Sequence, residues 1–179
     1  MAAQVRTDEG FTLIEVGIAM LITTVGVLAL AGVIAVGAHQ LTGSQDQLIA
    51  GERAAEAAES VFKARDTRVL TWAQIRNVHG AGGTDGGVFL DGPQSLRDPG
   101  ADGLCNTVDD GAIATVVTPG PDGLLGTPDD LVRPLTGFTR EIEIRDITAD
   151  LRQLRVIVTY NDSRGPEQYI LVTYLSAYA

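Results

Sequence analysis

The sequence predicts an α+β protein in which a long N-terminal helix packs on a C-terminal antiparallel β-sheet. The first observation is an apolar stretch. No Asp, Glu, Lys or Arg interrupts the chain between Glu15 and Asp46, and roughly thirty positions exceed the ~20 residues that a membrane-crossing helix needs. The second observation is the alternation of apolar and polar residues after Phe138, which is typical of antiparallel strands. With 179 residues, the chain can form one membrane helix and one small globular domain.

Residues Gly10 to Glu15 have the sequence Gly-Phe-Thr-Leu-Ile-Glu and begin the apolar stretch. These six residues resemble the processing site of type IV pilin-like proteins, the family of pilins and type II secretion pseudopilins. The resemblance implies that a prepilin peptidase cleaves between Gly10 and Phe11, and that the new amino terminus at Phe11 is N-methylated. It also implies the type IV pilin-like fold, in which the first half of the long helix spans the membrane.

Glu15 is a single carboxylate just inside this apolar helix. An acidic residue at the centre of a membrane helix costs about 2.5–3.5 kcal/mol on insertion scales, and a carboxylate removed from water favours a pairing cation. The resemblance pairs Glu15 with the terminal amine of Phe11 in a neighbouring subunit, which would set the axial stagger between subunits. An ordinary signal anchor, with its acid in the membrane interface, is the alternative.

The chain divides into segments of different composition. The amphipathic continuation of the helix carries an apolar seam at heptad spacing, which we expect to pack on the sheet rather than to form a coiled coil. The seam consists of Leu41, Leu48, Ala55 and Phe62. The segments are a cleaved cytoplasmic leader (1–10), a hydrophobic transmembrane and assembly helix (11–39), its amphipathic continuation (40–66), a Gly/Asp-rich variable region (67–137) and an antiparallel sheet (138–179).

An internal repeat lies in the Gly/Asp-rich region. The pattern Pro-Gly-x-Asp-Gly-Leu, then Thr-x-Asp-Asp, occurs in residues 98–110 and again in residues 118–130. Asp-Gly pairs form tight turns, and Ca²⁺ is bound by about six to eight oxygen ligands. The spacing resembles the aspartate-rich calcium loops of bacterial surface proteins, but it is not an EF-hand loop. The repeat is therefore either a pair of solvated turns or a calcium site, with these candidate ligands: Asp98, Asp102, Asn106, Asp109, Asp110, Asp122, Asp129 and Asp130.

The C-terminal alternation predicts strands at residues 138–147, 151–160 and 167–175, with a further short strand at 112–118. Period two with turn residues between the runs indicates an antiparallel meander. One face of this meander should cover the helix. The inward residues are predicted to be Ile142, Ile144, Leu154, Val156, Val158, Tyr160, Tyr169, Leu171, Thr173 and Leu175.

Composition and motifs argue against several functions. A net charge of −10 gives no broadly basic surface for nucleic acid. Cys105 is the only cysteine, so an intramolecular disulfide is impossible, and we interpret it as a loop thiol without function. His39 and His79 lie in no metal or nucleophile motif, and no phosphate loop or GxSxG motif is present. We therefore expect no enzymatic activity, and Ca²⁺ is the only candidate cofactor.

The sequence thus predicts a structural subunit of a type IV pilus or pilus-like filament. The missing cysteine pair and the strand-rich ending favour a minor pilin, and a type II secretion pseudopilin is the alternative. The expected partners are other pilin-like subunits, a prepilin peptidase, an inner-membrane assembly platform and membrane lipid. Before assembly the chain would cross the inner membrane once, with its globular domain outside the cytoplasm. A non-polymerising membrane protein, whose outer domain binds calcium or another ligand, is the alternative of a different class.

Overall fold

The computed structural model describes residues 12–80, 86–162 and 165–178, so Gly10 and Phe11 lie outside the described residues. The chain forms two compact units, Met1–Thr42 and Gly43–Ala179, which we describe separately. Helix α1, Leu13–Asp66, contributes to both units. Its sequence contains no proline, and a proline in the helix interior would remove a backbone hydrogen bond.

The first unit contains a helical segment with exposed apolar side chains. Residues Leu13–Ala35 are long and apolar enough to cross a membrane, and none of this segment is buried within the chain. The hydroxyls of Thr23 and Thr24 donate to the carbonyls of Ala19 and Met20, each at 2.7 Å. Because both hydroxyls are hydrogen-bonded within the helix, the free-energy cost of placing them in an apolar environment is lower.

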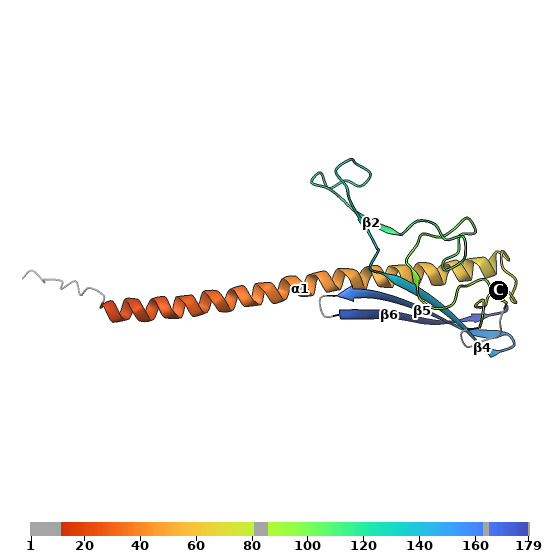
Figure 1. Ribbon diagram of the computed structural model, residues 1–179, viewed down its shortest axis with the longest axis horizontal. Coiled ribbons are helices and arrows are strands. Elements are labelled where there is room, and N and C mark those ends of the chain that lie inside the picture. Colours follow the sequence, from red (N-terminus) through yellow and green to blue (C-terminus); the bar gives the residue numbers. More distant parts are fainter. Residues whose placement is uncertain (1–11, 81–85, 163–164, 179) are drawn as a thin grey trace, which may run out of the picture. The chain divides into compact units, whose positions relative to one another are not determined.

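The second unit is built on a four-stranded antiparallel sheet of order β1-β4-β5-β6. Its strands β4, β5 and β6 are labelled in Figure 1. The three long strands confirm the predicted meander, and their inward residues alternate as expected, with Ile142, Leu154 and Val156 fully buried. The meander ends in Leu175, which is also fully buried. The strands are β1 (Gln94–Ser95), β4 (Thr139–Thr148), β5 (Leu151–Asp162) and β6 (Gly165–Ser176).

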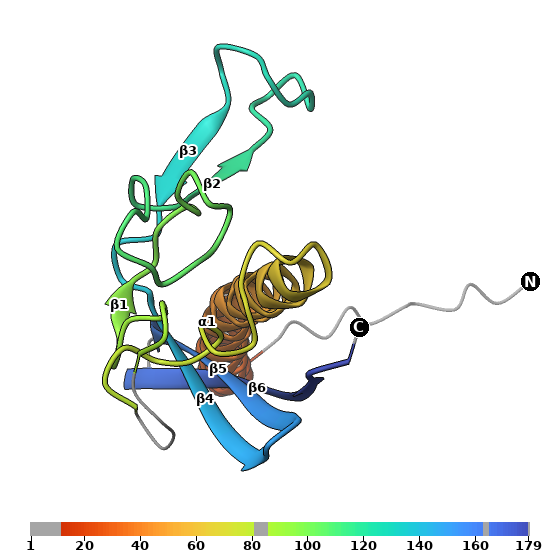
Figure 2. The same cartoon turned by 90° about the vertical axis from the view of Figure 1, so that its right-hand side faces the viewer.

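Helix α1 packs on this sheet mainly through alanines, so the predicted seam is right only in part: Phe62 packs against the core, as does Ala58 beside the seam, but Leu48 does not. Leu48 is 69% exposed, Ala55 and Phe62 are half-buried, and the side chain of Leu41 lies outside the described ones. Figure 2 shows α1 lying over the sheet. Small side chains let the helix approach closely, because protein interiors are close-packed. The buried helix residues are Ile49, Ala50, Ala54, Ala57, Ala58, Val61 and Ala64.

A separate two-stranded ribbon is formed by β2 (Thr115–Thr118) and β3 (Leu131–Pro134). The first strand is shorter than predicted, and the second was not predicted from its four residues, which include Pro134. The ribbon is attached to the helix by two arginines. Arg53 Nη2 donates to the carbonyl of Thr115 at 3.1 Å, and Arg133 Nη2 lies 2.7 Å from Asp46 Oδ1.

Buried polar side chains connect the loops to the sheet. Asn77 donates from Nδ2 to the carbonyl of Ile142 at 2.7 Å, and its Oδ1 accepts the N–H of Ile144 at 2.9 Å. Asn77 thus takes the place of a strand partner along β4, satisfying backbone groups that would otherwise be buried without a hydrogen bond.

Arg152, which is fully buried, ties the loop that follows α1 to the sheet. Its Nε donates to Asp146 Oδ1 at 2.6 Å, and its Nη1 donates to the carbonyls of Trp72 and Ile75. The guanidinium lies 4.0 Å from the centroid of the Trp72 ring, a cation–π geometry. Burial lowers the pKa of Arg152, and its hydrogen bond to Asp146 opposes that shift.

Candidate functional site

Two regions carry the residues that the sequence singles out, the start of α1 and the pair of aspartate loops. At the start of α1, Glu15 Oε2 accepts the backbone N–H of Thr12 at 3.0 Å and the Thr12 hydroxyl at 2.9 Å. The N–H of Glu15 lies 3.3 Å from the Thr12 hydroxyl oxygen. These reciprocal contacts form a capping box, with Thr12 at the N-cap and Glu15 three residues later.

The capping box reduces the need of the Glu15 carboxylate for a cation from another chain. The sequence interpretation treated its carboxylate as solitary and in need of an amine from another chain. The structure places two donors from Thr12 on that carboxylate, so part of its desolvation cost is offset locally. Since a carboxylate has about four lone-pair sites, it can still accept a hydrogen bond from a further donor.

Glu15 opens onto an apolar helix face. Val16, Met20 and Leu28 border a shallow groove along this face, which begins at Glu15. Exposed apolar surface of this extent marks a site of contact with lipid or protein. The described part of the first unit therefore combines the Glu15 carboxylate with an apolar surface that favours burial.

The aspartate loops have the same internal structure in both copies of the repeat. Gly103 and Gly123 both have φ of 71°, and each donates its N–H to the glycine three residues earlier, at 3.1 and 3.0 Å. Positive φ is a conformation that glycine adopts without steric cost. A side chain at Gly100 or Gly120 would collide with Asp109 or Asp129.

The carboxylates hold each loop together from inside. In the first copy Asp102 Oδ1 accepts the N–H of Leu104 at 2.8 Å, and Asp109 Oδ1 accepts the Thr107 hydroxyl at 2.8 Å. In the second copy the equivalent bonds, Asp122 to Leu124 and Asp129 to Thr127, measure 2.8 and 2.7 Å. The threonine hydroxyls lower the pKa of Asp109 and of Asp129.

The last aspartate of each copy closes the loop. Asp110 Oδ2 accepts the N–H of Asn106 at 3.0 Å, and Asp130 Oδ2 accepts the N–H of Gly126 at 2.6 Å. Asn106 and Gly126 both have positive φ, 60° and 87°. Asparagine is one of the few residues that tolerates this conformation, so the repeat keeps its backbone path although the residue differs.

The structure brings most of the candidate calcium ligands together within each copy, but it does not join the two copies into one site. Asp98 contributes to the base of the first loop through its backbone, because its N–H donates to Ala112 and its carbonyl accepts from Gly111, both at 2.9 Å. Within the described part of the chain, three or more His, Cys, Asp or Glu side chains nowhere converge in a way that could hold a metal ion. Whether the repeat is a calcium site or a pair of solvated turns stays untested.

The two copies differ in their surroundings. Leu104 and Cys105 are 1% and 0% exposed and belong to the core, whereas Leu124 and Leu125 are 62% and 65% exposed. Cys105 lies in a loop, as expected, and its side chain belongs to the core. Burial raises the pKa of its thiol, which makes it unreactive.

Asn106 and Arg140 join the first loop to the sheet, and the sequence analysis had not singled out Arg140. Its Nε donates to Asn106 Oδ1 at 2.7 Å, and Asn106 Nδ2 donates to the Arg140 carbonyl at 2.7 Å. The alternation could have identified it, because Arg140 lies on the same face of the strand as the inward residues Ile142 and Ile144. Arg152 likewise shares the parity of Leu154, although arginine at such a position is normally assumed to point outwards.

Fold and site together define an α+β protein with one apolar helix that could cross a membrane and an antiparallel sheet. No family model matches the chain, and searches of curated proteins and of solved structures found no significant match either.

Proposed function

We propose that this chain is a subunit of a type IV pilus or of a pilus-like filament, specifically a minor pilin, with a type II secretion pseudopilin as the alternative. The observation that carries the proposal is an apolar helix with no buried residue over Leu13–Ala35, whose first three residues are the end of the motif in residues 10–15. Such a helix must be covered by lipid before assembly and by other helices in a filament. The globular unit would then lie on the outer side of the membrane.

Processing is the first test of this proposal. Mass spectrometry of the mature chain should find a start at an N-methylated Phe11, produced by a prepilin peptidase in the host membrane. A chain that retains residues 1–10 would contradict the proposal.

The capping box allows a sharper test of Glu15. Glu15→Gln keeps a residue that can complete the box but removes the charge, Glu15→Ala removes both, and Thr12→Ala removes the capping partner and leaves the charge. If the carboxylate pairs with the Phe11 amine of a neighbour, both Glu15 variants should fail to enter filaments while Thr12→Ala assembles. Normal assembly of Glu15→Gln would instead limit Glu15 to capping its own helix.

A second function is favoured by one observation, the local pairing of Glu15 with Thr12. A carboxylate with donors in its own chain does not require an intermolecular amine, which suits a membrane protein that never polymerises. This alternative predicts an intact leader and a chain that stays monomeric when it is extracted in mild detergent.

A further inference from the structure

The second aspartate loop presents an apolar tip that the first loop keeps buried. Leu124 and Leu125 occupy the positions of Leu104 and Cys105 in the repeat. Leu124 and Leu125 are exposed, whereas Leu104 and Cys105 are buried. In the first copy, Leu104 and Cys105 pack in the core with residues of the helix and the sheet, and Arg140 donates a hydrogen bond to Asn106 of the same loop. The chain itself therefore contains an example of this loop fold docked on an apolar surface beside an arginine.

A groove that combines apolar side chains with arginines lies just beyond the C-terminal end of α1. It has a volume of about 430 Å³ and is bordered by Arg65, Arg68, Leu70, Trp72 and Tyr178, among other residues. Its Trp72 side chain is held in place before any partner arrives, because Trp72 Nε1 donates to the carbonyl of Ala149 at 2.9 Å and its ring stacks on Arg152. A preformed groove loses little entropy on binding.

Arg68 occupies a backbone position that suits glycine better. Its φ is 58°, just past the helix end, where glycine is the usual residue. An arginine in this left-handed conformation is strained, and such strain gathers at functional positions. Its side chain is exposed, so packing against the chain's own core does not account for it.

The charges of the loop and of the groove are complementary. The second loop carries Asp122, Asp129 and Asp130 around its two leucines. Of the groove's two arginines, Arg65 is paired with Asp66 at 2.6 Å. The Tyr178 hydroxyl, also in the groove, donates to Asp150 Oδ2 at 3.3 Å, so the attraction of an acidic partner falls on Arg68. Opposite charges around an apolar contact favour association and fix its register.

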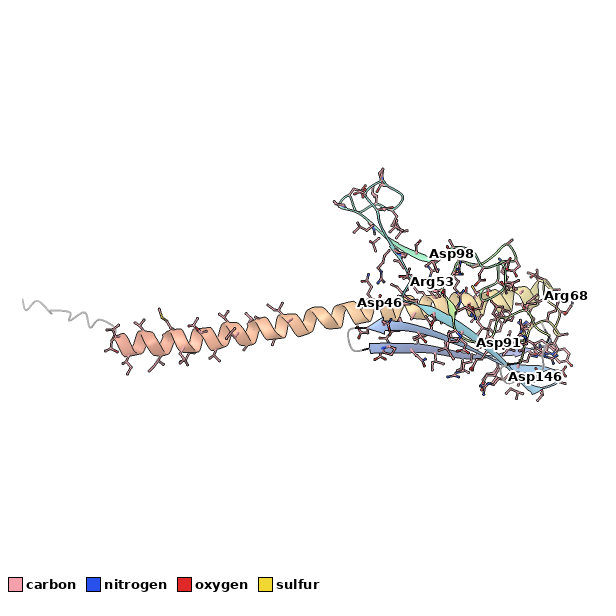
Figure 3. The ribbon with its side chains drawn as sticks, viewed as in Figure 1. Asp46, Arg53, Arg68, Asp91, Asp98 and Asp146 are labelled. Carbon is pink, nitrogen blue, oxygen red and sulfur yellow. The ribbon has the colours of Figure 1, made fainter. Side chains whose placement is uncertain are left out.

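One chain cannot make this contact with itself. The ribbon that carries the second loop is attached to α1 at Asp46 and Arg53, whereas Arg68 lies past the opposite end of this helical segment (Figure 3). At 1.5 Å per residue, the helix between Arg53 and Arg65 spans about 18 Å. The loop and the groove are therefore available to two different neighbours.

We propose that the tip of the second loop, Leu124 and Leu125 with the surrounding aspartates, docks into the groove beside Arg68 and Trp72 of a second copy of this chain. A contact between two different patches is head-to-tail, and repeated head-to-tail contacts produce open chains or helical filaments. The inference rests on the proposed filament function and assigns it a contact outside the apolar helix.

Disulfide cross-linking of the full chain in its host membrane tests the contact. Leu125→Cys combined with Tyr178→Cys should give dimers and a ladder of larger oligomers on oxidation, because each copy carries one cysteine of each kind. Each single variant should stay monomeric, and the buried native Cys105 should not react. The matched control combines Tyr178→Cys with Val108→Cys in the first loop, where Val108 is 87% exposed.

Three results would overturn the contact between copies. These are a monomeric double variant, an equal ladder from the Val108 control, or a Leu125 cross-link to a protein of different mass. Mass spectrometry of Phe11 in the same sample separates this inference from the filament proposal. A processed, filament-forming chain without the ladder removes only the docking contact, whereas a ladder from an unprocessed chain removes only the filament.

Arg68 variants in the cross-linking background test its role. Arg68→Gly relieves the backbone strain, so the melting temperature should hold or rise, while the ladder should weaken several-fold. Arg68→Lys keeps the charge and should retain most of the ladder. A ladder of full strength in Arg68→Gly would show that Arg68 has no part in the contact.

Discussion

The two aspartate loops have the same backbone conformation and equivalent internal hydrogen bonds. One loop is nevertheless part of the core, whereas the other is exposed to solvent. In the first loop, Leu104 and Asn106 are 1% and 0% exposed, whereas Leu124 in the second is 62% exposed. The repeat therefore specifies how the loop folds but not what the loop does. A loop that is already stable by its own turns can be placed on the core or extended towards a partner without a change of motif.

The largest expected difference between the copies comes from their leucines. Leu104→Ala should lower the free energy of unfolding by about 2–5 kcal/mol, because it leaves a cavity in the core. Leu124→Ala should change it by less than about 0.5 kcal/mol, because the side chain is exposed. Thermal or urea unfolding of the full chain in detergent measures both, and equal losses would contradict the distinction drawn between the loops.

A reciprocal exchange at the positive-φ position should have the next largest effect. Asn106→Gly keeps the backbone conformation but removes the acceptor of Arg140 Nε, which should cost about 1.5–3 kcal/mol. Gly126→Asn makes the second loop like the first and should be nearly neutral, since asparagine tolerates positive φ. Unfolding of the two variants side by side checks the prediction, and a neutral Asn106→Gly would exclude Arg140 as an anchor of the loop.

Acid should weaken both loops to a similar, small extent. The pKa values of Asp109 and Asp129 are lowered by the threonine hydroxyls, so each contributes stability above its unfolded pKa of 3.8. That stability is lost as pH falls below this value through the lower folded pKa. Asp109→Asn and Asp129→Asn should therefore melt below the parent chain at pH 7 and approach it near pH 3. A gap independent of pH would show that the charge is not responsible.

Added calcium should have the smallest effect. The aspartate oxygens of both loops already accept backbone or hydroxyl hydrogens, so we expect millimolar Ca²⁺ to leave the melting temperature unchanged, as for solvated turns. A rise that EDTA reverses, and that Asp109→Asn or Asp129→Asn abolishes, would instead support the calcium interpretation.

Local patterns predicted much of the fold because they are set by neighbouring residues. The alternation after Phe138 assigned Ile142, Leu154 and Leu175 to the inner face, since successive side chains of a strand point to opposite sides. The helix seam was only partly right, because heptad spacing suggested Leu48 where the core instead contains Ala54 and Ala57. Asn77, which substitutes for a strand partner of β4, has no local signal at all.

The sequence by itself determined the three long strands of the sheet, the apolar helix and the tight turns of each aspartate loop, because these depend on the identity and spacing of residues close along the chain. Only the tertiary structure decided which loop is buried, since Leu104 and Leu124 occupy the same place in the same motif. It also decided that Arg140 and Arg152 face inwards, where partners distant in sequence accept their hydrogen bonds. Burial is a property of what lies opposite a residue, and the chain brings those partners together only when it folds.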